Sequence, residues 1–263
     1  KKEFLLSKGS EMSAIEAVMP KTALDVFVYD TTKDSDGGAW RKRTQHTSWY
    51  NEKLNTTTRG SRKEFPAVAV IVMEYASAAG SSAMTIYDGD DPTLPMWMSC
   101  QVDGNNRWIR YNGTIRSVAA LNGIILAGAN GADLQDSLLS RMDLICDKLE
   151  RHFDGGTHQI DSRGIVHRNS NFIITYTGTQ SIINRYVNDV AMAVIGNAIN
   201  DSVTGLPIPT IAIATNGGVS IINDNGTVVD ITGTSQGSDA PVDQISFVGN
   251  HSILFSHRYA SEI

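Results

Sequence analysis

The fold class is decided by residues 210–231, which read TIAIATNGGVSIINDNGTVVDI. Three short runs rich in isoleucine, valine and threonine are separated here by the turns Asn216-Gly217-Gly218 and Asn223-Asp224-Asn225-Gly226. Asparagine–glycine pairs tolerate the positive φ angles of tight turns and are the strongest short-range signal for a β-hairpin. The stretch therefore predicts a meander of three antiparallel strands.

Similar groups of short strands recur along the rest of the chain. They cover residues 24–40, 67–98, 115–128, 163–183 and 244–255, with glycine-containing turns between apolar runs. Groups of three or four strands that repeat at roughly 40–50 residues are the signature of β-propeller blades. We predict an all-β chain folded as a β-propeller of short antiparallel blades, with about five blade-like groups that need not complete the ring. A β-sandwich or β-barrel is the alternative.

Length and composition exclude several classes of protein. The 263 residues are 41% hydrophobic and 19% charged, and the charged share is below the usual value of about 25%. The chain has no run of about 20 apolar residues, so we expect no membrane span. A net charge of −6 argues against a general nucleic-acid binder. Cys100 and Cys146 either form one disulfide or serve as two small hydrophobic side chains.

We divide the chain into an N-terminal extension, residues 1–20, and a β-propeller domain, residues 21–263. Within this domain, residues 132–153 break the strand pattern and predict a helical insertion that packs on the β core or at a subunit contact. Its apolar positions follow helical spacing and are Leu134, Leu138, Met142, Ile145, Leu149 and Phe153. The strand pattern of residues 253–259 stops abruptly, which predicts either a piece of something longer or a processed chain.

Residues 40–64 form a basic segment with interleaved aromatic residues. Such a segment can bind an acidic partner or nucleic acid, and tryptophan and arginine dominate the energetics of protein interfaces. The alternative is a solvated loop whose arginines and lysines pair with acids elsewhere on the same chain. We predict a loop at an interface, with these contact residues: Trp40, Arg41, Lys42, Arg43, Trp49, Arg59 and Arg62.

No motif designates a catalytic nucleophile, a phosphate-binding loop or a metal site. The six histidines are scattered without ligand spacing. The carboxylates Asp88, Asp90, Asp91 and Asp103 cluster in the sequence, but Gly89-Asp90-Asp91-Pro92 is more simply an exposed turn, with calcium binding as the alternative. We therefore predict a protein that is not an enzyme, with no catalytic, cofactor-binding or metal-binding residues and no cofactor.

The segment Asp34–Trp40, which reads DSDGGAW, resembles the Asp-box turn of sialidase-like propellers. The family pattern is Ser-x-Asp-x-Gly-x-Thr-Trp, and this segment fits it with one residue missing and without the threonine. The box is structural in that family, so the resemblance predicts a turn and supports a propeller.

A wider resemblance extends over most of residues 20–232. The matching words are KTALDVFVYD (21–30), KDSDGGAWRKRT (33–44), RGSRKEFPAV (59–68), YDGDDP with LPMWM (87–98) and residues 209–231. In this order they resemble a family of virion structural proteins of marine tailed phages. The resemblance implies a β-propeller located in the virion, in the tail or on the particle, and the nozzle of short-tailed phages is a plausible counterpart.

The same resemblance implies that the protein acts by assembly. Its expected partners are other virion proteins (portal, adaptor, tail or capsid), further copies of itself in a homo-oligomeric ring, and a host-surface ligand. One alternative is a receptor- or glycan-binding module of the virion, with Trp97, Trp108 and Tyr111 as an aromatic platform. A less favoured alternative is a sialidase-like polysaccharide hydrolase, which would need a pair of carboxylates in a groove.

Overall fold

The computed structural model describes residues 23–74, 81–102, 108–109, 113–131, 138–154, 158–173, 175–176, 181–232, 241–249 and 252–257. The predicted all-β class is confirmed, since these residues contain no α-helix. They contain three short 3-10 helices, η1 (Thr31–Lys33), η2 (Ala39–Arg43) and η3 (Ile165–His167). Among them, no helix has the length and apolar character needed to cross a membrane.

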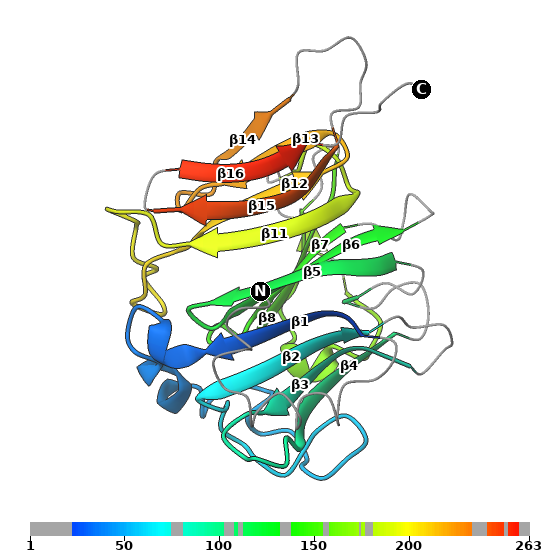
Figure 1. Ribbon diagram of the computed structural model, residues 1–263. Coiled ribbons are helices and arrows are strands. Elements are labelled where there is room, and N and C mark those ends of the chain that lie inside the picture. Colours follow the sequence, from blue (N-terminus) through cyan, green and yellow to red (C-terminus); the bar gives the residue numbers. More distant parts are fainter. Residues whose placement is uncertain are drawn as a thin grey trace.

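The strands form four antiparallel sheets, each a meander in chain order (Figure 1). The first sheet contains β1 (Ala23–Asp30), β2 (Val68–Glu74), β3 (Ser81–Asp88) and β4 (Met96–Val102). The second contains β5 (Gly113–Leu121), β6 (Ile124–Gly131), β7 (Leu138–Asp143), β8 (Lys148–His152), β9 (His158–Asp161) and β10 (Thr175–Tyr176). The third contains β11 (Val187–Ala193), β12 (Thr210–Thr215), β13 (Gly218–Ile222) and β14 (Val228–Ile231). The fourth contains β15 (Val242–Val248) and β16 (Ser252–His257).

The first strands of the four sheets lie next to one another. Strand β5 packs against β1 on one side and β11 on the other, and β11 in turn packs against β15. Figure 1 shows this series as β1, β5, β11 and β15 stacked through the middle of the molecule. Each sheet therefore continues outward from a strand that contacts the first strand of the next sheet.

Each of these four first strands carries an irregularity near its N-terminal end. The pairing register shifts between Ala23 and Asp25, between Ile115 and Ser117, between Val187 and Asp189, and between Val242 and Gln244. A β-bulge of this kind inserts one unpaired residue and re-aims the side chains beside it. The four sheets thus share a local repeat that none of the predicted sequence groups revealed.

At the first three bulges, the residue after the bulge ties its strand to the next sheet. Asp25 Oδ2 accepts a hydrogen bond of 3.0 Å from the backbone N–H of Val118 in β5. Asp189 Oδ2 in β11 accepts one of 2.9 Å from the N–H of Ile245 in β15. Between them, Ser117 Oγ accepts one of 3.3 Å from Val190 in β11. The same contact recurs at three successive sheet junctions.

The core lies between the sheets. The largest apolar cluster joins the first and second sheets and includes Trp40, Trp49, Phe65, Trp97 and Trp108. A second cluster joins the second and third sheets and includes Leu126, Leu139, Val190, Ile211 and Ile213. Burial of this apolar surface is the main favourable term that holds successive sheets together.

The predicted helical insertion at residues 132–153 is wrong where the structure describes it. Strands β7 and β8 form a hairpin there, and Asp143 Oδ1 accepts hydrogen bonds from the N–H groups of Ile145 and Cys146 in its turn. Met142 and Leu149 have the spacing of one helix face, but they lie directly opposite each other across the hairpin. The apolar residues of two buried strands joined by a short turn therefore have a spacing that resembles helical periodicity.

The described residues contain four sheets, whereas the sequence suggested about five blade-like groups. The groups at residues 24–40 and 67–98 merge, because β1 pairs with β2 across the intervening loop. Residues 175–176 of the group at 163–183 join the second sheet as β10. Local strand patterns do not show which distant segments pair, so merged groups were counted twice.

Candidate functional site

Two of the predicted interface residues belong to the core. Trp40 and Trp49 have no exposed side-chain surface. The Trp40 indole donates a hydrogen bond of 2.7 Å to Asp34 Oδ2, and the Trp49 indole donates one of 2.8 Å to the carbonyl of Leu144. Both polar N–H groups are satisfied inside the molecule, so these side chains present nothing to a partner protein.

The arginines of the same segment pair within the chain. Arg62 Nη1 donates to both Asp88 and Asp90 at 2.8–2.9 Å. Arg59 is fully buried, donates a hydrogen bond of 2.6 Å to the carbonyl of Trp97, and lies over the Trp97 ring with its guanidinium carbon 4.2 Å from the centroid. Burial lowers the pKa of Arg59 to about 10. These contacts match the alternative interpretation, in which the arginines of residues 40–64 pair with groups of their own chain.

The remaining basic residues lie nearer the surface. Arg41 donates a hydrogen bond of 3.0 Å to the carbonyl of Phe65, while the exposed Arg43 donates to Asp36 at 2.7 Å and to the carbonyl of Thr204 at 2.8 Å. Lys42 is exposed. Lys42 and Arg43 are therefore the most exposed of the predicted interface residues, while Arg62 is partly exposed.

The predicted glycan platform is not assembled on the surface. Trp97 is 1% exposed and Trp108 is fully buried, with their indoles donating to the carbonyls of Glu64 and Arg141 respectively. Tyr111 lies outside the described residues, as does Asp103 of the carboxylate cluster. A sugar that stacks on an aromatic face needs that face exposed, which the two tryptophans do not provide.

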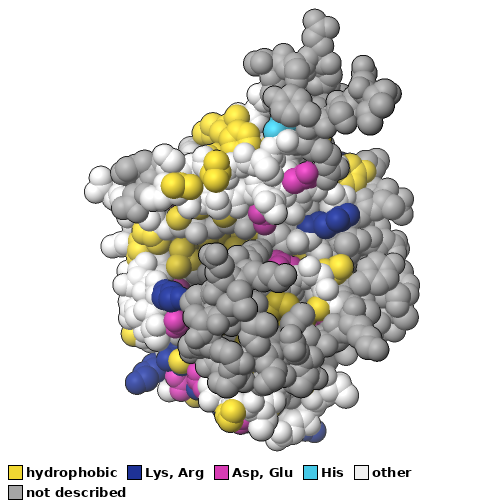
Figure 2. All heavy atoms as spheres, in the orientation of Figure 1, with side chains coloured by type: hydrophobic (Ala, Val, Ile, Leu, Met, Phe, Trp, Pro, Cys, Tyr) yellow, Lys and Arg dark blue, Asp and Glu magenta, His cyan; other side chains and the backbone are white. Residues whose placement is uncertain are grey.

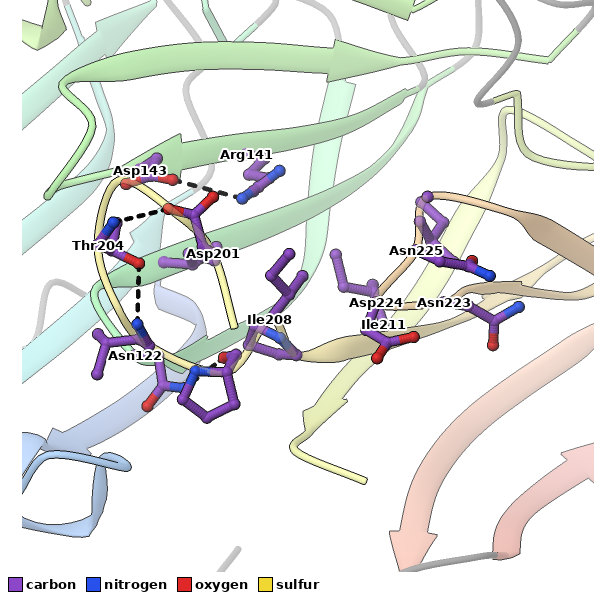
Figure 3. Close-up of a pocket in the computed structure, with 16 residues that line it drawn as sticks. Asn122, Arg141, Asp143, Asp201, Thr204, Ile208, Ile211, Asn223, Asp224 and Asn225 are labelled. Atoms are coloured by element: carbon purple, nitrogen blue, oxygen red, sulfur yellow. Dashed lines mark hydrogen bonds and ion pairs between the residues drawn. The ribbon is translucent and has the colours of Figure 1, made fainter. Parts of the chain in front are cut away.

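A cavity of about 310 Å³ lies between the second and third sheets (Figure 3). Arg141 and Asp143 of β7 lie on one side of it, and the turn Asn223–Asn225 after β13 lies on the other. Asp201 lines it from the connection between β11 and β12, and its Oδ1 accepts hydrogen bonds from the N–H groups of Val203 and Thr204. Its carboxylates are thus engaged in holding the turns around the cavity.

Arg141 links this cavity to a buried polar group in the second sheet. Its Nη1 donates a hydrogen bond of 3.0 Å to Glu150 Oε2. Glu150 in turn lies beside two histidines, with its Oε2 3.9 Å from His152 Nε2 and 3.5 Å from His158 Nε2. Burial alone would raise the pKa of Glu150, but the charge of Arg141 and the two imidazoles hold it well below its usual range.

The cluster of Glu150, His152 and His158 was not predicted from the sequence. The residues come from adjacent strands, since His152 of β8 lies opposite His158 of β9 in the register. The available signal was Glu-x-His followed after five residues by a second histidine, across the turn sequence Asp154-Gly155-Gly156. Reading these residues as a hairpin would have placed all three side chains on one face.

The fourth sheet exposes apolar side chains. Val248, Leu254 and Phe255 have exposed fractions of 54%, 64% and 39%. Figure 2 shows hydrophobic side chains gathered in the upper part of the molecule, where β14 and β16 lie in Figure 1. Strand β16 carries no lysine, aspartate or glutamate, and charged residues are the usual protection of an edge strand against pairing.

No protein-family model matches this chain, and no curated protein matches it.

Proposed function

We propose that this chain is a structural component of a phage virion, and that its sheets are successive blades of a β-propeller. The virion role rests on the resemblance of residues 20–232 to virion structural proteins, and the repeated bulge with its side-chain contact to the next sheet supports the propeller. In a propeller each blade meets the next one in the same way, so equivalent positions make equivalent contacts at every junction. Asp25, Ser117 and Asp189 occupy such positions.

A groove along the first strands supports the same architecture. It has a volume of about 680 Å³ and is lined by Asp25 of β1, Arg116 of β5, Asp189 of β11 and Gln244 of β15. Inner strands of propeller blades face a common central channel. One polar residue from each sheet in one groove is the arrangement that a channel wall requires.

The fourth sheet supplies the surface for assembly. Gln244 holds the position equivalent to Asp25 and Asp189, and its side chain is exposed. The exposed Leu254 and Phe255 line the same groove. We propose that a further β-sheet, supplied by a neighbouring protein of the particle, packs here as each described sheet packs on the one before it.

Composition and structure of the particle test this function. Mass spectrometry of purified particles from the phage that encodes this chain should detect it among the structural proteins. Cryo-electron microscopy should place it in a ring, with the fourth sheet against a neighbouring sheet. Absence of the chain from purified particles would overturn the proposal.

A pair of variants tests the assembly surface. Leu254→Lys places a charge on the exposed face of β16 and should reduce incorporation into particles at least about tenfold, because burying an unpaired charge is strongly unfavourable. Val203→Lys is the matched control, since Val203 is 78% exposed on the connection between β11 and β12. Both variants should keep the circular dichroism spectrum of the original chain. Equal incorporation of the two variants contradicts the assigned surface.

A further inference from the structure

We propose that Glu150, His152 and His158 form a binding site for a divalent transition-metal ion, with Zn²⁺ as the best fit. Their three ligand atoms lie within 4.8 Å of one another, and all three residues are buried. Two imidazole nitrogens and one carboxylate oxygen are a common set of protein ligands for zinc. Calcium and magnesium prefer oxygen ligands alone, so this set favours zinc over them.

The β8–β9 hairpin preorganises the three ligands. Glu150 and His152 are two residues apart in β8, so both point to the same face of the sheet. His158 lies opposite His152 in β9 and therefore shares that face. The two imidazoles are stacked, with ring centroids 4.3 Å apart and planes 13° apart. Because one hairpin supplies all the ligands, the site forms with local structure and can take up the ion during folding.

The distances are close to those of a filled site. Bonds of about 2.0–2.2 Å from zinc to nitrogen and oxygen place the ligand atoms of a tetrahedral site about 3.4 Å apart. Glu150 Oε2 is 3.5 Å from His158 Nε2 and 3.9 Å from His152 Nε2. All three pairs of ligand atoms lie within 4.8 Å, so binding requires the ligand atoms to move closer together. Three protein ligands leave the fourth position to a water molecule.

Neighbouring charges hold the carboxylate in place. Arg141 Nη1 donates to Glu150 Oε2 at 3.0 Å, and its Nη2 lies 3.4 Å from Asp143 Oδ2. An outer partner of this kind orients a ligating carboxylate. Glu150 and Asp143 together carry one negative charge more than Arg141, which partly compensates the charge of a divalent cation.

Titration of the purified chain with Zn²⁺ tests the site. Isothermal titration calorimetry should give one bound ion per chain, and the melting temperature should rise with added Zn²⁺ but not with the same concentration of Mg²⁺. Loss of an outer partner weakens metal binding about 10- to 100-fold. His152→Gln and His158→Gln each remove a direct ligand, so each should weaken Zn²⁺ binding by at least this much. His46→Gln is the matched control, because His46 is exposed and remote from the cluster in sequence.

Three results would overturn the site: no saturable Zn²⁺ binding, equal loss in the His46 variant, or unchanged binding in both cluster variants. If the cluster variants fail to fold, the original chain still decides. A crystal soaked with Zn²⁺ should then give an anomalous difference peak between Glu150, His152 and His158. A peak elsewhere alone would reject the proposal.

Discussion

Asp34 Oδ2 accepts a hydrogen bond of 2.7 Å from the indole nitrogen of Trp40, and through it the loop after β1 is fixed in the core. The same oxygen accepts one of 2.6 Å from the Tyr29 hydroxyl, while Oδ1 accepts one of 2.7 Å from the N–H of Asn122 in the β5–β6 turn. One carboxylate thus joins the first sheet to the second. The segment predicted to be an Asp-box-like turn is a turn, and its aspartate holds two sheets together.

Asp34→Asn should destabilise the chain by about 1–3 kcal/mol, because an amide nitrogen would then face one of these donors inside the core. Chemical denaturation followed by tryptophan fluorescence measures the change. Asp36→Asn in the same turn is the matched control, since Asp36 is partly exposed and should cost less. If both variants lose the same stability, the three contacts of Asp34 do not carry the junction.

Replacement of Arg168 should also destabilise the chain strongly. It is 1% exposed and forms two hydrogen bonds with Glu52, of 2.8 Å and 3.0 Å, which attach the basic segment to the region after β9. Arg168→Met leaves Glu52 without this partner and should cost about 3–5 kcal/mol. Arg62→Met breaks a pair whose arginine is 34% exposed and should cost about 0–1 kcal/mol. Denaturation midpoints that differ little between these variants would contradict the ranking.

The sequence predicted the strands better than their partners. Residues 210–231 form β12, β13 and β14 with turns at the two glycine-containing sites, as their alternation and turn chemistry required. Pairing of β1 with β2 depends on contacts across a long loop, which no local pattern contains. The prediction that Trp40 and Trp49 contact a partner is wrong for a related reason. An aromatic residue in a basic loop is ambiguous until the buried partner of its N–H group is known.

The histidine cluster shows where local patterns could have succeeded. His152 and His158 lie six positions apart, a spacing that has no meaning for a helix. In a hairpin they become direct neighbours, and the observed register places them so. The helix predicted over residues 132–153 excluded a hairpin here, because helical periodicity places Glu150 and His152 on different faces.

The two thiols should be unreactive in the folded chain. Cys100 and Cys146 are free, so the disulfide alternative is not realised, and burial raises the pKa of each thiol to about 12. The thiolate is the reactive form, so alkylation by iodoacetamide at pH 8 should be slow for the folded chain and fast after unfolding. Since the folded chain disfavours the thiolates, the free energy of unfolding should fall as pH rises from about 9 towards 12. Mass spectrometry of the alkylated chain and denaturation at high pH measure the two effects. Rapid labelling of Cys100 before unfolding would contradict its burial.

The bulge contact of Asp189 predicts a local loosening of the fourth sheet. Asp189 Oδ2 holds the N–H of Ile245 in β15, while Oδ1 accepts from the Ser117 hydroxyl in β5, so the carboxylate joins three sheets. Asp189→Ala should remove about 1–3 kcal/mol from the docking of β15 and β16. Hydrogen exchange of amides in residues 242–257 should accelerate about 5- to 140-fold, since 1.4 kcal/mol corresponds to a factor of 10. Exchange in β2 and β3 should stay unchanged, because these strands lie beyond β1 in the first sheet.

Asp230→Ala is the control, as Asp230 is exposed on β14 and bonds Ser220 within its own sheet. Uniform acceleration over all four sheets would mean that Asp189 supports the whole fold and not one junction. The contact after the bulge would then not be a contact that stabilises one sheet junction.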